Sequence, residues 1–263
     1  MPSLETTDAL GRPIVLDAPP RRIVSLVPSQ TELLADLGLD AEVVGLTRFC
    51  VHPEGWKARK TTVGGTKNLR LDRIEALRPD LALANREENE RDQVEAVAAL
   101  APVYVTDVAT VADALAMVRA VGRLVDRALR ANALADEIEN GFALLEAAEP
   151  VRAAYFIWRE PWMTVGGDTF ISDVMGRAGL VNVFGDRTRY PEVTPEAVRA
   201  AQPEILLLSS EPYPFKAAHA EALQAETGVP AVLVDGELFS WYGSRMRLAP
   251  SYLRALRERL VAA

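Results

Sequence analysis

The sequence predicts an α/β protein with two Rossmann-like lobes, each built on a parallel sheet, joined by a single long rigid helix. Three observations lead to this class. Strand and helix patterns alternate along residues 1–109, and the same alternation returns along residues 151–263. Residues 110–150 show helical spacing and no strand pattern. We therefore predict an amino-terminal α/β lobe at 1–109, a helical connector at 110–150 and a carboxy-terminal α/β lobe at 151–263.

A repeated unit is the clearest sign of two lobes. Each copy is a short helix with an acid near its start, Asp72 or Glu196, and these acids lie 124 positions apart (196 minus 72). Seven residues later a proline, Pro79 or Pro203, ends the helix, because proline lacks an N–H and restricts the residue before it. An acid and an uninterrupted apolar run follow, which is typical of a parallel strand buried on both faces.

Local patterns place the elements of the first lobe. Gly38 is suited to end a helix, and Pro19-Pro20 break the chain after the first hairpin. The expected elements are a hairpin at 4–17, a strand at 22–27, a helix at 32–37, a strand at 41–46, the first repeat unit at 69–84, a helix ending at Leu100 and a strand at 103–105. This βαβ order indicates a parallel sheet with helices on both faces.

The middle of the chain is helical by its apolar spacing. A second helix, at about 129–148, would be about 30 Å long at 1.5 Å per residue, and Pro150 would end it. A long helix placed between two lobes is most simply a rigid connector. The alternative is a pair of packing helices within one domain.

The second lobe repeats the order of the first. The loop at 186–191 takes the place that the loop at 48–53 has in the first lobe. The expected elements are a strand at 153–157, a glycine turn at 166–170 into a helix that Gly179 ends, a strand at 181–183, the second repeat unit at 193–208, a strand at 232–234 and a terminal helix.

Composition excludes several classes of protein. The net charge of −8 and the absence of a basic cluster argue against nucleic acid as a partner. Cys50 is the single cysteine, so no intramolecular disulfide can form. No apolar stretch is long enough to span a membrane, and the residues from Met1 do not resemble a signal peptide. The protein is therefore expected to be cytosolic unless the sequence omits an export signal.

Four segments carry a family resemblance: residues 22–34 with Leu37-Gly38, 71–81, 166–171 and 179–183. Together they resemble the substrate-binding proteins of ABC importers for cobalamin, haem and ferric siderophores, the helical-backbone (class III) periplasmic binding proteins. The resemblance covers nearly the whole chain in the expected order.

The resemblance implies two lobes joined by one rigid helix, with a ligand cleft between them. It implies a non-catalytic receptor, periplasmic or at the membrane surface, that is monomeric, has no cofactor and delivers a metal chelate to an ABC permease. In the family one acid on each lobe docks onto permease arginines, and Asp72 and Glu196 match those acids. The alternative is that each acid only complements its helix dipole, worth about 0.3–1 kcal/mol.

Loops at the carboxyl ends of the strands should hold the ligand. Aromatic rings suit a flat or bulky ligand and arginines suit carboxylate or phosphate, although any one aromatic could equally be a core residue. The candidates are Phe49, His52, Lys67, Asn68, Asn85 and Arg86 in the first lobe, and Trp158, Arg159, Trp162, Tyr190, Trp241, Tyr242 and Arg245 in the second. Cobalamin binders usually place tryptophan where this chain has Lys67 or Asn68, Asn85 and Tyr190, which favours a more polar, anionic ligand.

Cys50 and His52 are the only pair that suggests a metal. Two ligands do not make a site, so no bare-metal site is expected, and His52 remains an alternative ligand for the metal of a bound chelate. The sequence contains no phosphate-binding loop, nucleophile elbow or zinc-protease motif. Two hypotheses of function remain: a solute receptor, or a cytosolic ligand carrier or enzyme on the same scaffold.

Overall fold

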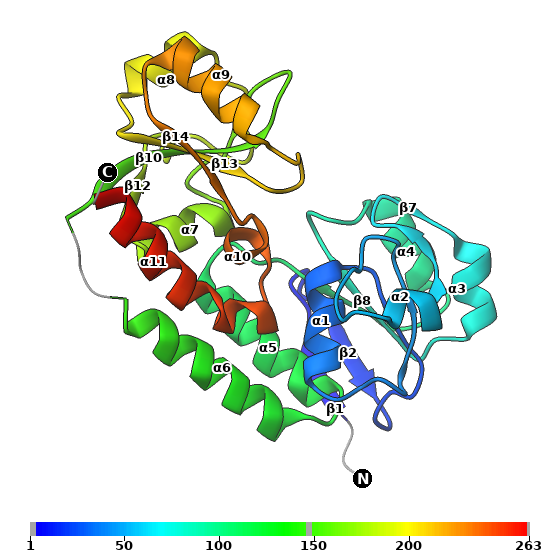
Figure 1. Ribbon diagram of the computed structural model, residues 1–263. Coiled ribbons are helices and arrows are strands. Elements are labelled where there is room, and N and C mark those ends of the chain that lie inside the picture. The colour runs from blue at the N-terminus through cyan, green and yellow to red at the C-terminus, as the bar shows by residue number, and fades with distance from the viewer. Residues whose placement is uncertain (1–3, 146–148, 262–263) are drawn as a thin grey trace. The chain divides into compact units, whose positions relative to one another are not determined.

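The computed structural model describes residues 4–145 and 149–261 and divides them into two compact units (Figure 1). Unit 1 takes the chain up to Val108, together with Ala112–Glu139 and Tyr242–Arg245. Unit 2 takes Ala109–Val111, Asn140–Trp241 and the chain from Met246 onward. Each unit is built on its own mainly parallel sheet, which confirms the predicted α/β class.

Unit 1 contains a five-stranded, wholly parallel sheet in the order β5-β4-β3-β8-β9. Its strands are β3 (Ile23–Ser25), β4 (Val43–Leu46), β5 (Thr61–Thr62), β8 (Leu81–Asn85) and β9 (Val103–Thr106). Its first four helices are α1 (Pro28–Asp36), α2 (Trp56–Arg59), α3 (Leu71–Leu77) and α4 (Arg91–Ala98). Two antiparallel hairpins complete it, β1 (Leu4–Thr7) with β2 (Pro13–Leu16) and β6 (Gly64–Gly65) with β7 (Asn68–Leu69).

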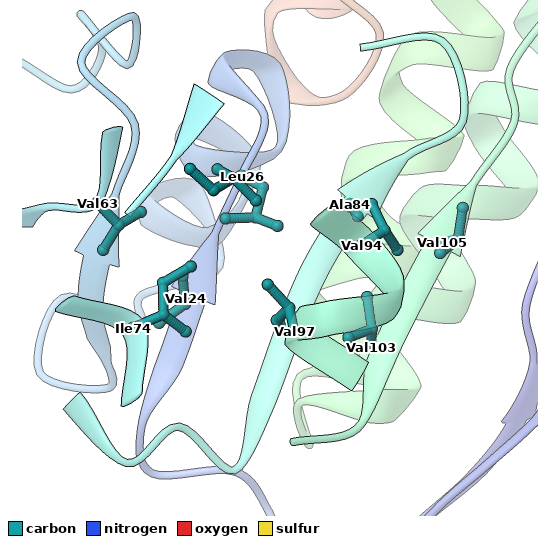
Figure 2. Close-up of a cluster of buried hydrophobic side chains, with 11 residues drawn as sticks. Val24, Leu26, Val63, Ile74, Ala84, Val94, Val97, Val103 and Val105 are labelled. Carbon is teal, nitrogen blue, oxygen red and sulfur yellow. The ribbon is translucent and has the colours of Figure 1, made fainter. Parts of the chain in front are cut away.

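The core of unit 1 explains why β8 is apolar as far as Ala84, one residue before its end. All five residues of β8 are buried, as expected for a strand with neighbours on both sides and helices over both faces. Figure 2 shows one of these faces, where Ile74 of α3 lies near Val24, and Val97 of α4 lies near Val103. Branched side chains of helix and strand fill this layer closely, so the sheet is a rigid support for the loops at its edge.

Unit 2 repeats this arrangement with β12-β10-β13-β14 in place of β4-β3-β8-β9, and all three pairings are parallel. Its strands are β10 (Val151–Trp158), β12 (Leu180–Asn182), β13 (Ile205–Ser209) and β14 (Ala231–Val234), and β11 (Met163–Thr164) pairs antiparallel with β10. Its helices are α7 (Phe170–Arg177), α8 (Pro195–Ala201), α9 (Ala217–Thr227), α10 (Glu237–Ser240) and α11 (Ala249–Val261). A 3₁₀ turn, η1 (Ser244–Arg247), precedes α11.

The predicted repeat is confirmed in detail. Helices α3 and α8 each end one residue before a left-handed residue, Arg78 (φ 45°) or Gln202 (φ 50°), and a proline follows directly. An arginine at the start of the neighbouring strand then binds each helix end. Arg22 donates to the Leu77 carbonyl at 2.6 Å, and Arg152 donates to the carbonyls of Ala201 (2.6 Å) and Gln202 (3.0 Å). Cations at these carbonyls complement the negative end of the helix dipole.

The middle segment forms two helices, α5 (Val111–Leu124) and α6 (Ala128–Ala143). Asp126 takes a left-handed conformation (φ 56°) in the turn between them. The helix predicted at about 129–148 therefore starts near its expected position but ends at Ala143, and residues 146–148 lie outside the described part. The three-part division at 109 and 150 stays a prediction.

Helices α5 and α6 approach closely at one point. A Cβ added at Gly122 would lie 2.1 Å from the Cβ of Ala131, so only glycine allows this contact. None of the helices described is long and apolar enough to cross a membrane.

Candidate functional site

The loop after β4 presents an aromatic ring and a cation at the carboxyl edge of the unit 1 sheet. Phe49 is half exposed (50%), and the Arg48 guanidinium lies 5.0 Å from its ring centre. The loop rests on the β6–β7 hairpin, because Arg48 N–H donates to the Gly64 carbonyl at 2.8 Å. A Cβ at Gly65 would lie 3.0 Å from Arg48 Nη2, so this glycine lets the two side chains lie against the hairpin.

The other candidates from the loop and hairpin are also at the surface. Lys67 in the turn of the hairpin and Asn68 at the start of β7 are both exposed, and the Lys67 carbonyl accepts a hydrogen bond from Gln93 Nε2 at 3.0 Å. His52 is partly buried and precedes Pro53 through a cis peptide bond. Phe49, Lys67 and Asn68 are therefore accessible to a ligand at this edge.

Asn85 has a different position from the one expected for a ligand-facing residue. It is buried (2% exposed) at the end of β8, where its Oδ1 accepts from the N–H groups of Glu87 and Glu88. Its Nδ2 donates to the carbonyl and hydroxyl of Thr106, each at 3.1 Å. Asn85 thus shapes the following loop, in which the exposed Arg86 forms an ion pair with Asp107 at 2.9 Å.

Unit 2 carries a cluster of aromatic side chains at the carboxyl ends of β10 and β13. The β10–β11 register shifts between Phe156 and Trp158, and such a bulge redirects side chains. Trp158 is 41% exposed and meets Tyr213 edge to face, with ring centres 5.5 Å apart. Trp162 stacks on Phe215 at 6.0 Å with nearly parallel rings. The cluster forms a firm aromatic surface from which Trp158 extends.

His219 joins this cluster from the start of α9, packing on Tyr213 and Phe215. Its Nδ1 accepts a hydrogen bond from the Lys216 N–H at 3.1 Å. The ring proton must therefore be on Nε2, which makes His219 a hydrogen-bond donor in its neutral form.

The loop after β12 is the counterpart of the loop after β4. The Arg187 guanidinium lies 5.3 Å from the ring centre of the buried Phe184, and the Gly167 N–H donates to the Arg187 backbone carbonyl at 2.9 Å. Tyr190, from the same loop, is partly buried. Arg159, after β10, lies 5.8 Å from the Trp162 ring and 3.5 Å from a Glu160 carboxylate oxygen.

Trp241 and Tyr242 are buried rather than presented to solvent (9% and 8% exposed). Trp241 Nε1 donates to Glu211 Oε1 at 2.8 Å, and the Ser240 hydroxyl donates to the same oxygen at 2.6 Å. Burial raises the pKa of Glu211, opposed by these two hydrogen bonds. Trp241 thus anchors the end of the α10 region within unit 2.

Arg245 forms a two-point ion pair with Glu32 of α1. The Nη2 and Nε atoms lie 2.7 and 2.8 Å from the two carboxylate oxygens. The side chains are only 14% and 15% exposed. The guanidinium therefore holds the segment Tyr242–Arg245 on unit 1.

The two repeat acids occupy matching positions in the first turns of α3 and α8. Asp72 and Glu196 are 65% and 73% exposed, and each meets an arginine near it, Arg70 or Arg199. A hydrogen bond from Arg70 lowers the pKa of Asp72, and hydrogen bonds from its own backbone N–H and from Thr194 lower the pKa of Glu196. Both carboxylates are therefore ionised and accessible at neutral pH.

Cys50 lies in the core of unit 1, with its sulfur 3.0 Å from the Thr31 hydroxyl and 3.2 Å from that of Thr47. Burial raises the pKa of its thiol. Across residues 4–145 and 149–261, no three His, Cys, Asp or Glu side chains gather in a way that could hold a metal ion.

Sequence reasoning missed five residues at these edges: Arg48, Arg187, Tyr213, Phe215 and His219. The segment Glu211-Pro-Tyr-Pro-Phe215 comes two residues after a predicted strand, so its aromatic residues could have been found by the rule that identified Trp158. Arg48 and Arg187 lie in the loops at 48–53 and 186–191, so the same rule reached their positions, whereas their shared contacts with phenylalanine and glycine appear only in the fold.

Sequence comparisons place this chain among known binding proteins. A family model described as periplasmic binding protein matches residues 23–232. The vitamin B12-binding protein of Pectobacterium atrosepticum is 28% identical over 242 residues, which is 88% of this chain and 86% of that protein. The vitamin B12-binding protein of Yersinia pestis (strain Pestoides F) is 26% identical over 238 residues, 88% of this chain and 84% of the relative.

Solved structures of proteins named for different ligands have the same fold. The periplasmic vitamin B12 binding protein BtuF of Vibrio cholerae has a TM-score of 0.80 at 20% identity, covering 93% of this chain and 99% of its own. The periplasmic haem-binding protein BhuT, in complex with two haems, has a TM-score of 0.78 at 23% identity, covering 92% and 98%. The siderophore-binding protein BauB, bound to two acinetobactin molecules and ferric iron, has a TM-score of 0.80 at 18% identity, covering 96% and 98%.

Proposed function

Because this chain belongs to the periplasmic binding protein family, as its resemblance predicted, we propose that it is the substrate-binding component of an ABC importer. Its substrate is a metal chelate of the cobalamin, haem or ferric siderophore class, the ligand classes named for its relatives and structural neighbours. It acts outside the cytoplasmic membrane, as the family name indicates. The alternative, a cytosolic carrier or enzyme, has no supporting observation, since these relatives are binding proteins by name.

The observation that carries this proposal is the exposure of large rings at the carboxyl ends of parallel strands. Phe49 after β4 and Trp158 at the end of β10 are 50% and 41% exposed. Solvent-exposed aromatic rings on rigid sheets are suited to bind a flat or bulky organic surface, and ligands of open α/β sheets bind at this edge. Trp158 is further supported by Tyr213, so little side-chain entropy is lost on binding.

Tryptophan fluorescence tests this function directly. The purified protein is titrated with cyanocobalamin, haemin and ferric siderophores, and the complexes are checked by native mass spectrometry. At least one should bind, and Trp158→Ala should weaken that binding about 5–30-fold, as expected for losing an aromatic contact worth about 1–2 kcal/mol. Leu129→Ala, which changes an 89% exposed residue on α6, is the matched control. No binding to any probe by a correctly folded protein would refute the proposal.

Delivery to a permease is assigned to Asp72 and Glu196. Their matched places in α3 and α8 support a pair of charged contacts to arginines of a two-fold symmetric partner. The variants Asp72→Ala and Glu196→Ala should keep ligand affinity within about twofold and lose uptake in proteoliposomes that contain the cognate permease. Glu75→Ala, an exposed acid on the same helix as Asp72, is the control and should keep uptake. Loss of ligand binding in the Asp72 or Glu196 variant would contradict the assignment.

His52 is the residue proposed to reach the metal of a bound chelate, should the ligand offer an open coordination position. The test is the visible spectrum of the haemin complex, in which His52→Ala should shift the Soret band. An unchanged spectrum would remove this role.

A further inference from the structure

The two units carry matching arginines at the same place in their sheets. Arg48 follows β4 and Arg187 follows β12. These strands are counterparts, because each pairs in parallel with the first strand of its unit's main sheet, β3 or β10. Both residues therefore lie at the carboxyl edge of a sheet.

Each arginine is held by the same kind of contacts. The guanidinium groups lie over the rings of Phe49 and Phe184, at 5.0 and 5.3 Å from the ring centres. A cation over an aromatic face is held in orientation while its N–H groups stay free to bind outward.

A glycine pair supports each of these arginines. The backbone N–H of Arg48 donates to the Gly64 carbonyl, and the backbone N–H of Gly167 donates to the Arg187 carbonyl. A Cβ at Gly166 would lie 2.4 Å from the Arg187 carbonyl oxygen, so the close approach requires glycine. The arrangement is thus built by two separate parts of the chain in each unit.

Within the described part of the chain, Arg48 and Arg187 lack the carboxylate partner that other arginines at the carboxyl edges of the sheets have. The other edge arginines, at 86, 159 and 189, lie 2.9, 3.5 and 3.7 Å from the carboxylates of Asp107, Glu160 and Asp168. Among the described residues, neither Arg48 nor Arg187 has a carboxylate within 4.0 Å. The sequence holds 37 acidic against 29 basic residues, so acids are in excess, and yet no described carboxylate forms an ion pair with either of these two guanidinium groups.

We propose that Arg48 and Arg187 each bind an anionic group of the substrate and select a chelate that carries carboxylate or phosphate groups. Guanidinium recognises both groups through paired N–H donors, and the phenylalanine beneath it presents those donors outward. The proposal rests on the proposed function and narrows its ligand class.

A charge series of ferric chelates tests the proposal with the intact protein. Ferric citrate is anionic, ferrichrome is neutral and ferrioxamine B is cationic, and tryptophan fluorescence measures all three. Cyanocobalamin is included as a bulky probe of a different class. Arg48→Gln and Arg187→Gln are compared with Arg48→Lys, which keeps the charge, and with Arg91→Gln, a control on α4 whose partner is Glu95.

The wild-type protein should prefer ferric citrate, and each glutamine variant should weaken that binding about 10–100-fold, the range for losing a hydrogen-bonded charged partner. Binding of ferrichrome or cyanocobalamin should change less than about twofold, and Arg48→Lys should recover part of the loss. Equal weakening of anionic and neutral probes would overturn the proposal, as would undiminished binding of ferric citrate. Wild-type binding to cyanocobalamin or ferrichrome but not to ferric citrate would overturn the anion preference while leaving the receptor function standing. Binding of no probe in this series would overturn the anion preference, and the receptor function would be refuted as well if haemin also failed to bind.

Discussion

Replacing Arg245 by methionine should destabilise unit 1, because it leaves the Glu32 carboxylate without its cation in a place that water barely reaches. The two side chains are 14% and 15% exposed and share two hydrogen bonds of 2.7 and 2.8 Å. Breaking a fully buried pair costs about 3–5 kcal/mol, and the remaining exposure reduces this to about 2–4 kcal/mol. Methionine keeps the apolar stem, so the change reports mainly the lost charge.

A double-mutant cycle separates the ion pair from packing. We expect Glu32→Gln and Arg245→Met to show a coupling energy of about 1.5–3 kcal/mol in guanidinium denaturation followed by circular dichroism. Hydrogen exchange of peptides covering α1 should rise in each single variant. The exposed pair Arg119 and Asp136, at 30% and 63%, is the control and should couple by less than about 1 kcal/mol.

A coupling below about 0.5 kcal/mol, or one equal to that of the exposed pair, would refute the reasoning. The same variant tests the predicted ligand role of Arg245. Because Glu32 occupies its guanidinium, ligand affinity should fall less in Arg245→Met than in Trp158→Ala.

Two further predictions concern packing and protonation. Gly122→Ala should destabilise the protein by about 1–3 kcal/mol in thermal denaturation, because the new Cβ would lie 2.1 Å from that of Ala131. Gly176→Ala, in a helix with open space around that position, should instead stabilise the protein by about 0.5–1 kcal/mol. Equal effects of the two substitutions would contradict the packing argument. Glu211 has a raised pKa in the folded protein, so the folded state binds more protons than the unfolded one above pH 4.5, and stability falls as pH rises through the raised value. The Glu211→Gln variant keeps a side-chain carbonyl that can accept the hydrogen bond from Trp241. Its free energy of unfolding should equal that of the wild type at pH 4 and exceed it at pH 7.5. The same difference between variant and wild type at both pH values would contradict this prediction.

Local chemistry explains which parts of the fold could be predicted. The repeat was readable because an acid, a proline seven residues later and an apolar run each act on nearby backbone. The end of α6 was not readable, because nothing in the sequence before Pro150 stops the helix at Ala143. Just past that end, the Leu144 carbonyl accepts a hydrogen bond from Arg254 of α11 at 3.3 Å, a contact that the local pattern does not carry.

The sequence predicted which residues follow strands at the candidate site, but it predicted less well which of their side chains are exposed. Phe49 and Trp158 follow strands and are exposed, and the same rule selected Asn85 and Trp241, which the fold buries. Their burial comes from partners far along the chain, such as Glu211, 30 residues from Trp241. Sequence position tells which edge of a sheet a residue follows, whereas its exposure is decided by these distant contacts.

Cys50 has a practical consequence for measuring motion in this protein. It is the single cysteine of the sequence, fully buried, and its raised pKa disfavours the reactive thiolate. Cysteines introduced at two exposed positions, such as Arg91 in unit 1 and Glu221 in unit 2, can therefore carry fluorophores while the native thiol stays unlabelled. Energy transfer between the labels would then follow the distance between the two units as substrate is added, in an otherwise natural sequence.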